Sequence, residues 1–404
     1  MSIEAAYMVP HPPMIVPRVG RGSEKQVEKT IRAYEAVAAE IAEIRPETIL
    51  VTSPHAVLYA DYFHISPGER AEGDFGSFGA PDVRFRERYD TELAGAVCRL
   101  AEERKFPAGT LGERDRRLDH GTMVPLYFIE QKYTDFRLVR IGLSGLPLAD
   151  HYTFGQILRQ AVEQAGRRAV LIASGDLSHK LQSYGPYGYA EEGPLYDARI
   201  MDTAGRAAFG EMLEFDEHFC DKAAECGHRS FVIMAGALDG LRVEAKVYSH
   251  EDVTGVGYGI CSFRPKGTDD SRRFLDRYRA AQEEKLRQKR NAEDAYVRLA
   301  RETVERYVRE GKTPGEPDWA TAEMKKDRAG VFVSIHKDGN LRGCIGTFLP
   351  TRENIAREII SNAVSAPHGT RGLNRFGRRS CPGWRSMWTC SPPRRGSAAR
   401  RSWM

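Results

Sequence analysis

The chain has 404 residues, of which 41% are hydrophobic, and its 60 Lys and Arg against 56 Asp and Glu give a formal net charge of +4. No segment approaches the roughly 20 uninterrupted apolar residues of a membrane helix, and the N-terminus lacks the pattern of a secretory signal. Seven scattered cysteines without a CxxC pair disfavour a disulfide framework and a zinc ribbon. We therefore expect a cytoplasmic protein of two or three domains with no membrane partner.

The net charge is unevenly distributed along the chain. Residues 367–404 contain nine Arg but no Lys, Asp or Glu, and removal of these charges takes the net charge from +4 to −5 for residues 1–366. The body of the chain therefore gives no reason to expect a nucleic-acid partner. The tail also holds three of the four Trp. We interpret residues 367–404 as a frame-shifted reading of GC-rich DNA, with a basic nucleic-acid-binding arm as the alternative.

The first 265 residues alternate between short apolar runs and segments with helical spacing. Predicted strands cover residues 4–9, 48–52, 136–142, 169–173, 242–249 and 255–263, and the main predicted helices cover 23–44, 91–103, 123–131, 151–166 and 229–241. Strands that alternate with helices are typical of βαβ units. The pattern predicts an α/β fold with a mostly parallel sheet covered by helices on both faces.

A turn-rich break ends this first domain, which we place at residues 1–265. The next residues are highly charged and helix-forming up to Gly311, and we interpret residues 266–290 as a helical linker. A smaller α+β domain, incomplete at its C-terminal end, is predicted at residues 291–366. Its predicted elements are a hairpin of residues 330–336 and 341–348 and an amphipathic helix of residues 351–366.

Histidines follow three of the predicted strands. His11 comes after the first strand, His55 after the second, and His179 six residues after the strand at 169–173. Loops that leave the carboxyl ends of parallel strands converge on one edge of the sheet, where ligands bind. His120 precedes an apolar helix and can join them. A single histidine is more often structural, but four in this arrangement predict a functional site.

A metal ion would account for this cluster. Neutral imidazole binds iron, zinc and copper, and two His with one carboxylate leave open positions on a non-haem Fe(II). Glu225 can supply the carboxylate, with capping of the following helix as its alternative role. The neighbouring Cys226 is a second candidate for the third ligand, and it would favour copper or zinc.

Four motifs stand out in this region. In chain order they are YMVPHPP (Tyr7–Pro13), SPH (Ser53–His55), DHG (Asp119–Gly121) and SGDLSH (Ser174–His179). Together they resemble the class III extradiol ring-cleaving dioxygenases of the LigB type. The resemblance implies a mononuclear non-haem Fe(II) bound by His11, His55 and Glu225. It also implies that His179 and His120 are the acid/base residues.

Two further resemblances concern the possible role of the chain. The first 265 residues are also similar to the Memo proteins, relatives of these dioxygenases, and a Memo-like site would use Cys226 as the third ligand. The sequence LRGCIGT (Leu341–Thr347) and the helix after it resemble the AMMECR family. A fusion of the two domain types resembles proteins of the AmmeMemoRadiSam system, which implies a radical-SAM protein as partner.

The expected chemistry depends on the metal and on its neighbours. An Fe(II) with three protein ligands can accept a catechol-like diol or an aminophenol together with O₂. Ring cleavage needs proton transfer, and His179 suits this role because imidazole titrates near neutral pH. We expect His120 to orient the substrate or polarise O₂. Asp176 would fix the tautomer of His179 or cap its loop.

Two main hypotheses remain open. The first is an extradiol-type dioxygenase acting on a small aromatic substrate, in which Tyr184, Tyr187 and Tyr189 wall the pocket or form a lid. The second is a Memo-like metal-binding protein that serves a radical-SAM partner without ring cleavage. A hydrolytic metalloenzyme is disfavoured because the chain has neither a Gly-rich phosphate loop nor a GxSxG motif. A homo-oligomer is left open.

Overall fold

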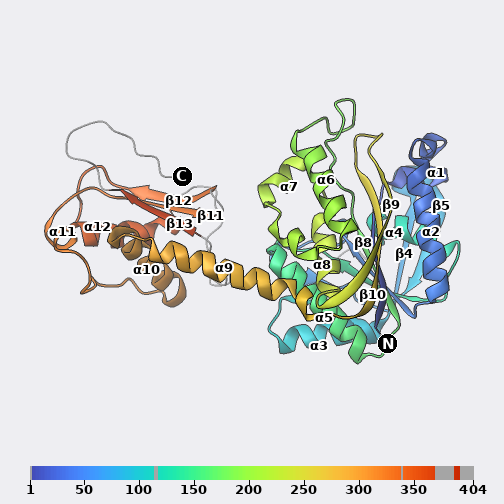
Figure 1. Cartoon of the computed structure of the whole chain (residues 1–404), viewed down its shortest axis with the longest axis horizontal. Helices are drawn as coiled ribbons and strands as arrows, with labels where there is room; N and C mark the ends of the chain where they lie inside the picture. The colour runs from blue at the N-terminus through green and yellow to red at the C-terminus, as the bar shows by residue number, and fades with distance from the viewer. Residues whose placement is uncertain (1, 113–116, 338–339, 369–385, 392–404) are drawn as a thin grey trace. The chain divides into compact units, whose positions relative to one another are not determined.

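In the computed structural model, the apolar runs of the N-terminal half form a sheet that lies between helices (Figure 1). The sheet has six strands in the order β7-β2-β8-β1-β10-β9. Its strands are β1 (Ile3–Val9), β2 (Thr48–Ser53), β7 (Arg137–Gly142), β8 (Ala169–Ser174), β9 (Leu241–Glu251) and β10 (Tyr258–Thr268). β7, β2, β8 and β1 pair in parallel, whereas β10 is antiparallel to both of its neighbours. The prediction of a mostly parallel α/β sheet is therefore confirmed.

Alternate residues of the inner strands enter two separate hydrophobic cores, one on each face of the sheet. Along β1, for example, Tyr7 and Val9 belong to one core and Met8 to the other. Because both faces are covered, the parallel strands are mainly apolar along their whole length and do not alternate between apolar and polar residues. The helices over one face are α2 (Glu28–Ile44) and α4 (His120–Glu130), and those over the other are α3 (Thr91–Glu103), α5 (Leu148–Gln164), α6 (Glu192–Gly205) and α8 (His228–Ala237).

Smaller elements complete this part of the chain, and the hairpin of β4 and β5 was not predicted. Its side chains Phe75 and Phe85 pack into the core beneath α2 and α4, and its turn carries Phe78. The smaller elements are β3 (Phe63–His64), β4 (Arg70–Phe75), β5 (Ala80–Arg88), β6 (Ala108–Gly109), α1 (Pro17–Gly20) and α7 (Glu217–Ala223).

The structure describes residues 2–112, 117–337, 340–368 and 386–391, and it divides the chain into two compact units, Met1–Tyr278 and Arg279–Met404. The division falls within α9. In place of one charged helix up to Gly311, the chain forms α9 and α10, because Asp294 starts a new helix by accepting a 2.8 Å hydrogen bond from the backbone N–H of Val297.

The second unit builds a core of its own from helices and a three-stranded sheet of order β12-β11-β13. The predicted hairpin is present as β11 and β12, and the amphipathic helix is present as α12. The elements of this part are α9 (Phe274–Asn291), α10 (Ala295–Glu310), α11 (Ala322–Lys326), α12 (Ile355–Ser365), β11 (Phe332–Lys337), β12 (Asn340–Gly346) and β13 (Ser386–Ser391).

The Arg-rich tail lies mostly outside the described residues. Its described part includes β13, which pairs antiparallel with β11, although the sequence shows no strand periodicity there. A frame-shifted origin of residues 367–404 stays a prediction. Within the described ranges, no helix has the length and apolar character needed to cross a membrane.

Candidate metal centre

Four imidazoles meet at the carboxyl end of the parallel strands. His11 and His55 each lie two residues beyond their strands, β1 and β2, and His120 is the first residue of α4. The ring centroids of His55 and His120 are 3.9 Å apart, and those of His11 lie 4.7 Å from His55 and 5.4 Å from His120. His179 comes from the loop after β8. The structure therefore brings together four histidines, each more than 40 residues from the next in the sequence.

A contact between two glycines brings Cys226 to the same place. A Cβ atom on Gly175 would lie only 2.0 Å from the Cα of Gly227, so the two loops can cross only with glycine at this point. The backbone N–H of Gly227 donates to the carbonyl of Asp176 at 3.1 Å, and the N–H of Asp176 donates to Sγ of Cys226 at 3.3 Å. This crossing directs the thiol toward the imidazoles.

His11, His55 and Cys226 have the arrangement of a metal-binding site. Their ligand atoms all lie within 4.8 Å of one another. Nε2 of His11 is 3.0 Å from Nε2 of His55 and 3.6 Å from Sγ of Cys226. An ion with tetrahedral geometry, about 2.0–2.1 Å from each nitrogen and about 2.3 Å from sulfur, would place the two nitrogens about 3.3 Å apart and the nitrogen and sulfur about 3.6 Å apart. The three residues therefore fit a metal ion.

Ser174, the last residue of β8, fixes the tautomer of His11. The hydroxyl of Ser174 donates its hydrogen to the carbonyl of Gly121 at 2.6 Å, so toward Nδ1 of His11, 2.9 Å away, it can only accept. Nδ1 of His11 therefore carries the proton, and the lone pair of Nε2 faces His55 and Cys226. A hydrogen bond of this kind orients a metal-binding imidazole. Sequence reasoning missed this role, although Ser174 opens the SGDLSH motif.

The structure departs from the expectation that Glu225 is the third ligand. The carboxylate of Glu225 accepts a 2.6 Å hydrogen bond from the backbone N–H of His228, the first residue of α8. This is the capping role that was its alternative, and it is favoured because the first N–H groups of a helix lack partners within the helix. Cys226 occupies the position beside His11 and His55 instead.

Asp176 and His179 form a second group that shares Cys226. Ligand atoms of these three residues also lie within 4.8 Å of one another. Oδ1 of Asp176 accepts a 2.7 Å hydrogen bond from the backbone N–H of His11, so Asp176 holds the segment that carries this candidate ligand. Nε2 of His179 is buried and has no hydrogen-bond partner among the residues that the structure describes, which leaves it available to a bound molecule.

Burial sets the charge state of the site. Burial lowers the pKa of His11, and the neighbouring imidazoles lower it further. It also lowers the pKa of His55, and it lowers the pKa of both His120 and His179 to about 4. Burial also raises the pKa of Asp176 to about 7. The imidazoles are therefore neutral at physiological pH, which is the form that binds a metal ion or accepts a proton.

Aromatic side chains stand beside the outer histidines. Phe78, from the turn between β4 and β5, lies 5.3 Å from the ring of His120. Tyr187 lies 5.0 Å from the ring of His179 and is 58% exposed. All three predicted tyrosines are more than half exposed, and among the described residues Tyr187 is the one whose ring lies against a site histidine. Phe78 escaped sequence reasoning because no motif marks the hairpin that carries it.

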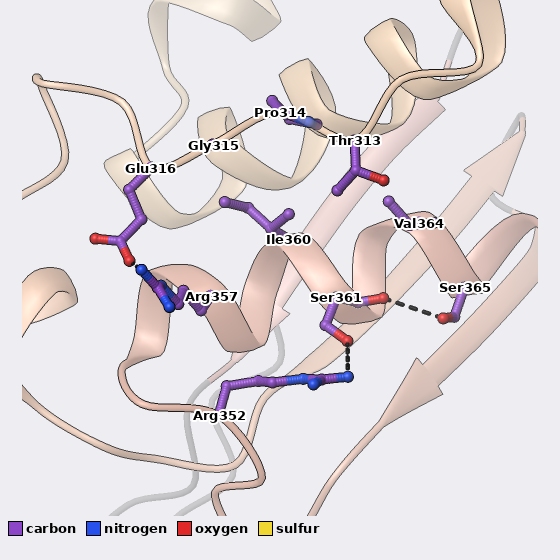
Figure 2. Close-up of a pocket in the computed structure, with 10 residues that line it drawn as sticks. All are labelled: Thr313, Pro314, Gly315, Glu316, Arg352, Arg357, Ile360, Ser361, Val364 and Ser365. Atoms are coloured by element: carbon purple, nitrogen blue, oxygen red, sulfur yellow. Dashed lines mark hydrogen bonds and ion pairs between the residues drawn. The ribbon is translucent and has the colours of Figure 1, made fainter.

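The second unit contains a cavity of about 640 Å³ between residues 313–316 and α12 (Figure 2). Its lining includes neither His nor Cys. The guanidinium of Arg357 is held by Glu316 at 2.5 Å and by Glu353 at 2.6 Å, so its charge is already balanced. The described lining of this cavity therefore offers no imidazole or thiol to a metal ion, in contrast to the histidine cluster of the first unit.

Comparison with known proteins agrees with this geometry. Residues 5–261 match the family described as the catalytic LigB subunit of aromatic ring-opening dioxygenase. The chain belongs to the LigB family. C-terminal to the LigB domain in the sequence, residues 297–371 match the AMMECR1 family. The resemblances seen in the sequence are thus confirmed for both domains.

Three relatives show the range of the LigB family to which this chain is similar. Protein CA_C1420 of Clostridium acetobutylicum is 38% identical over 384 residues, which cover 93% of this chain and 80% of the relative. The beta subunit of 2-aminophenol 1,6-dioxygenase from Pseudomonas sp. is 26% identical over 64% of this chain and 93% of its own length. A MEMO1 family protein of Methanosarcina mazei is 26% identical over 45% of this chain and 69% of its own length.

Proposed function

We propose that the LigB domain is a metal-binding protein of the MEMO1 kind, with its ion held by His11, His55 and Cys226. One observation carries this proposal: Sγ of Cys226, and not the carboxylate of Glu225, lies beside the two imidazoles. A thiolate with two imidazoles suits copper and zinc as well as iron. The similarity to a MEMO1 family protein supports the same assignment.

The surrounding residues define what the chain itself contributes. A redox-active ion would supply electron-transfer and O₂ chemistry at this position. Asp176 holds the backbone of His11, and Ser174 holds its ring, so that the lone pair of His11 is directed before a metal arrives. Nε2 of His179 can accept a proton from, or donate a hydrogen bond to, a molecule bound next to the ion.

Extradiol ring cleavage is the second candidate function. It is favoured by His120 and His179 next to the candidate ligands and by the aromatic rings of Phe78 and Tyr187. In this case the protein would cleave a catechol-like diol or an aminophenol with O₂, with His179 as the proton acceptor for the substrate hydroxyl. The relative named 2-aminophenol 1,6-dioxygenase makes an aminophenol a natural first substrate to test.

The partner in the first proposal is a radical-SAM protein. This part rests on the fusion of LigB and AMMECR1 domains, which is similar to the organisation of AmmeMemoRadiSam proteins. Co-purification of the tagged full chain with a radical-SAM protein from its native cells, under anaerobic conditions, tests it. Absence of such a protein from stringent pull-downs would contradict this partner.

Metal analysis combined with a substrate panel separates the two functions. The chain, purified anaerobically, is loaded with Fe(II), Cu(I) or Zn(II), and bound metal is counted. Each form is then mixed with catechol and 2-aminophenol in aerated buffer. We expect one ion per chain and no yellow ring-cleavage product. Catalytic formation of that product by the iron form would make extradiol cleavage the function instead.

A further inference from the structure

β9 forms one border of the six-stranded sheet. In the part of the chain that the structure describes, β9 pairs with β10 and with no other strand (Figure 1). It is 11 residues long, which corresponds to about 37 Å of strand at about 3.4 Å per residue. The carbonyl of Leu241 accepts a hydrogen bond from Arg272. Among the described residues, none outside the sheet bonds to the backbone of residues 243–247, so the outer N–H and C=O groups of this stretch are available to a further strand.

The regular part of β9 is centred on Ala245. Its pairing with β10 runs without interruption from Val243 to Val247, and an irregularity follows on each side. Three side chains of this stretch are accessible: Val247 is 47% exposed, and the side chains of Glu244 and Lys246 are 65% and 60% exposed. A second strand could therefore pair with five regular residues.

We propose that this edge pairs with the same edge of a second copy of the chain. In an antiparallel pairing with Ala245 on the two-fold axis, Glu244 faces Lys246 of the second copy, and Val243 faces Val247. The pairing is its own complement, because each acidic residue meets a basic one and each valine meets a valine. Cross-strand pairs of both kinds stabilise antiparallel sheets. Two six-stranded sheets would then continue into each other.

Charged residues on edge strands commonly prevent such pairing. Whether they repel or attract a second copy depends on the order of their signs along the strand. Two lysines at these positions would repel a second copy. Here the charges alternate in sign on one face of β9. The partners within the chain, Lys266 at 2.8 Å from Glu244 and Glu40 at 3.6 Å from Lys246, leave both side chains more than half exposed. They can therefore share a further opposite charge.

Cysteine cross-linking of the full chain tests the register directly. In Ala245→Cys the new thiol would face its own copy across the axis, with Cβ atoms about 4.5–5.5 Å apart, so oxidation with diamide should give a covalent dimer of twice 45.3 kDa. In Arg242→Cys the two thiols would be about 20 Å apart, and no cross-link should form. Equal cross-linking of both variants, or none with Ala245→Cys, would overturn the proposal.

Charge reversal provides the second test, read as molar mass by light scattering over a dilution series. Lys246→Glu and Glu244→Lys should each raise the dimer dissociation constant at least about tenfold, and the double variant should restore it because both pairs are re-formed with exchanged signs. Lys285→Glu on the exposed side of α9 makes the same change in net charge as Lys246→Glu and should have no effect. A monomeric wild-type chain, or a dimer insensitive to the single reversals, would overturn the proposal. Thermal unfolding shows that each variant is folded.

Discussion

Ser174→Ala should weaken metal binding by about 10–100-fold, the range typical of lost hydrogen bonds behind a metal-binding histidine. His11 is 2% exposed and Ser174 is 0% exposed, so no water can easily replace the missing hydroxyl at Nδ1. Either the Nδ1–H group stays buried without an acceptor, at a cost of about 1–3 kcal/mol, or the proton moves to Nε2 and blocks the lone pair. Both outcomes reduce affinity.

The loss of metal affinity in Ser174→Ala is measured by competition between the full chain and a chromophoric chelator for Co(II) or Zn(II). Ser262→Ala is the matched control, because Ser262 is a buried serine of β10 in the same sheet, and its hydroxyl bonds to Tyr248 and not to a site residue. Ser174→Thr keeps the hydroxyl and should recover most of the affinity. If Ser174→Ala binds metal as tightly as Ser262→Ala while both are folded, the tautomer argument is wrong.

Three further predictions concern proton transfer, pH dependence and the second unit. His179→Ala should keep stoichiometric metal but lose about 10²-fold or more of any turnover found in the substrate panel; loss of the metal itself would show that His179 is a ligand. The hydrogen bond to buried Asp197, 2.7 Å away, raises the pKa of His250, so the stabilisation by this pair is complete below pH about 6.5 and is lost as the pH rises through the raised pKa. The melting temperature of the wild type should accordingly fall more between pH 6 and 9 than that of His250→Asn, and parallel curves would refute this. Glu358→Gln should destabilise α12 by about 2 kcal/mol, because the buried carboxylate accepts hydrogen bonds from Thr347, Thr351 and Arg352. Hydrogen exchange of the α12 amides measures this loss of stability, with Glu353→Gln at an exposed position as the control. Equal exchange rates in the two variants would contradict the prediction.

The histidine cluster could be predicted because it depends on a general property of parallel sheets. β1, β2 and β8 are short, mainly apolar runs, which identifies them as buried strands, and their carboxyl ends share one edge of the sheet. His11 and His55 follow these strands directly, so their meeting requires no knowledge of loop conformation. The same reasoning correctly gave the α/β class of the first domain.

The choice between Glu225 and Cys226 could not be made from the sequence. The two residues are neighbours, and which side chain faces the histidines depends on the backbone between α7 and α8. That backbone turns at Ala224, which has a φ of 53°, and is then held by the contact between Gly175 and Gly227. This contact joins segments about 50 residues apart, and hydrophobic periodicity carries no information about it.

Phe78 illustrates a second limit. Residues 70–88 are rich in charged residues and glycine, so their spacing predicts no strand, yet Phe75 and Phe85 find places in the core beneath α2 and α4. Tertiary packing therefore decides the hairpin. The turn between its strands brings Phe78 to His120 as a consequence.

X-ray absorption spectroscopy of the zinc-loaded chain tests the central claim most directly. The account predicts a zinc–sulfur shell at about 2.3 Å in the wild type and in Glu225→Gln, and its loss in Cys226→Ser together with a large drop in affinity. A spectrum with only nitrogen and oxygen ligands at about 2.0–2.1 Å, unchanged in Cys226→Ser but altered in Glu225→Gln, would contradict it and return the third position to the carboxylate.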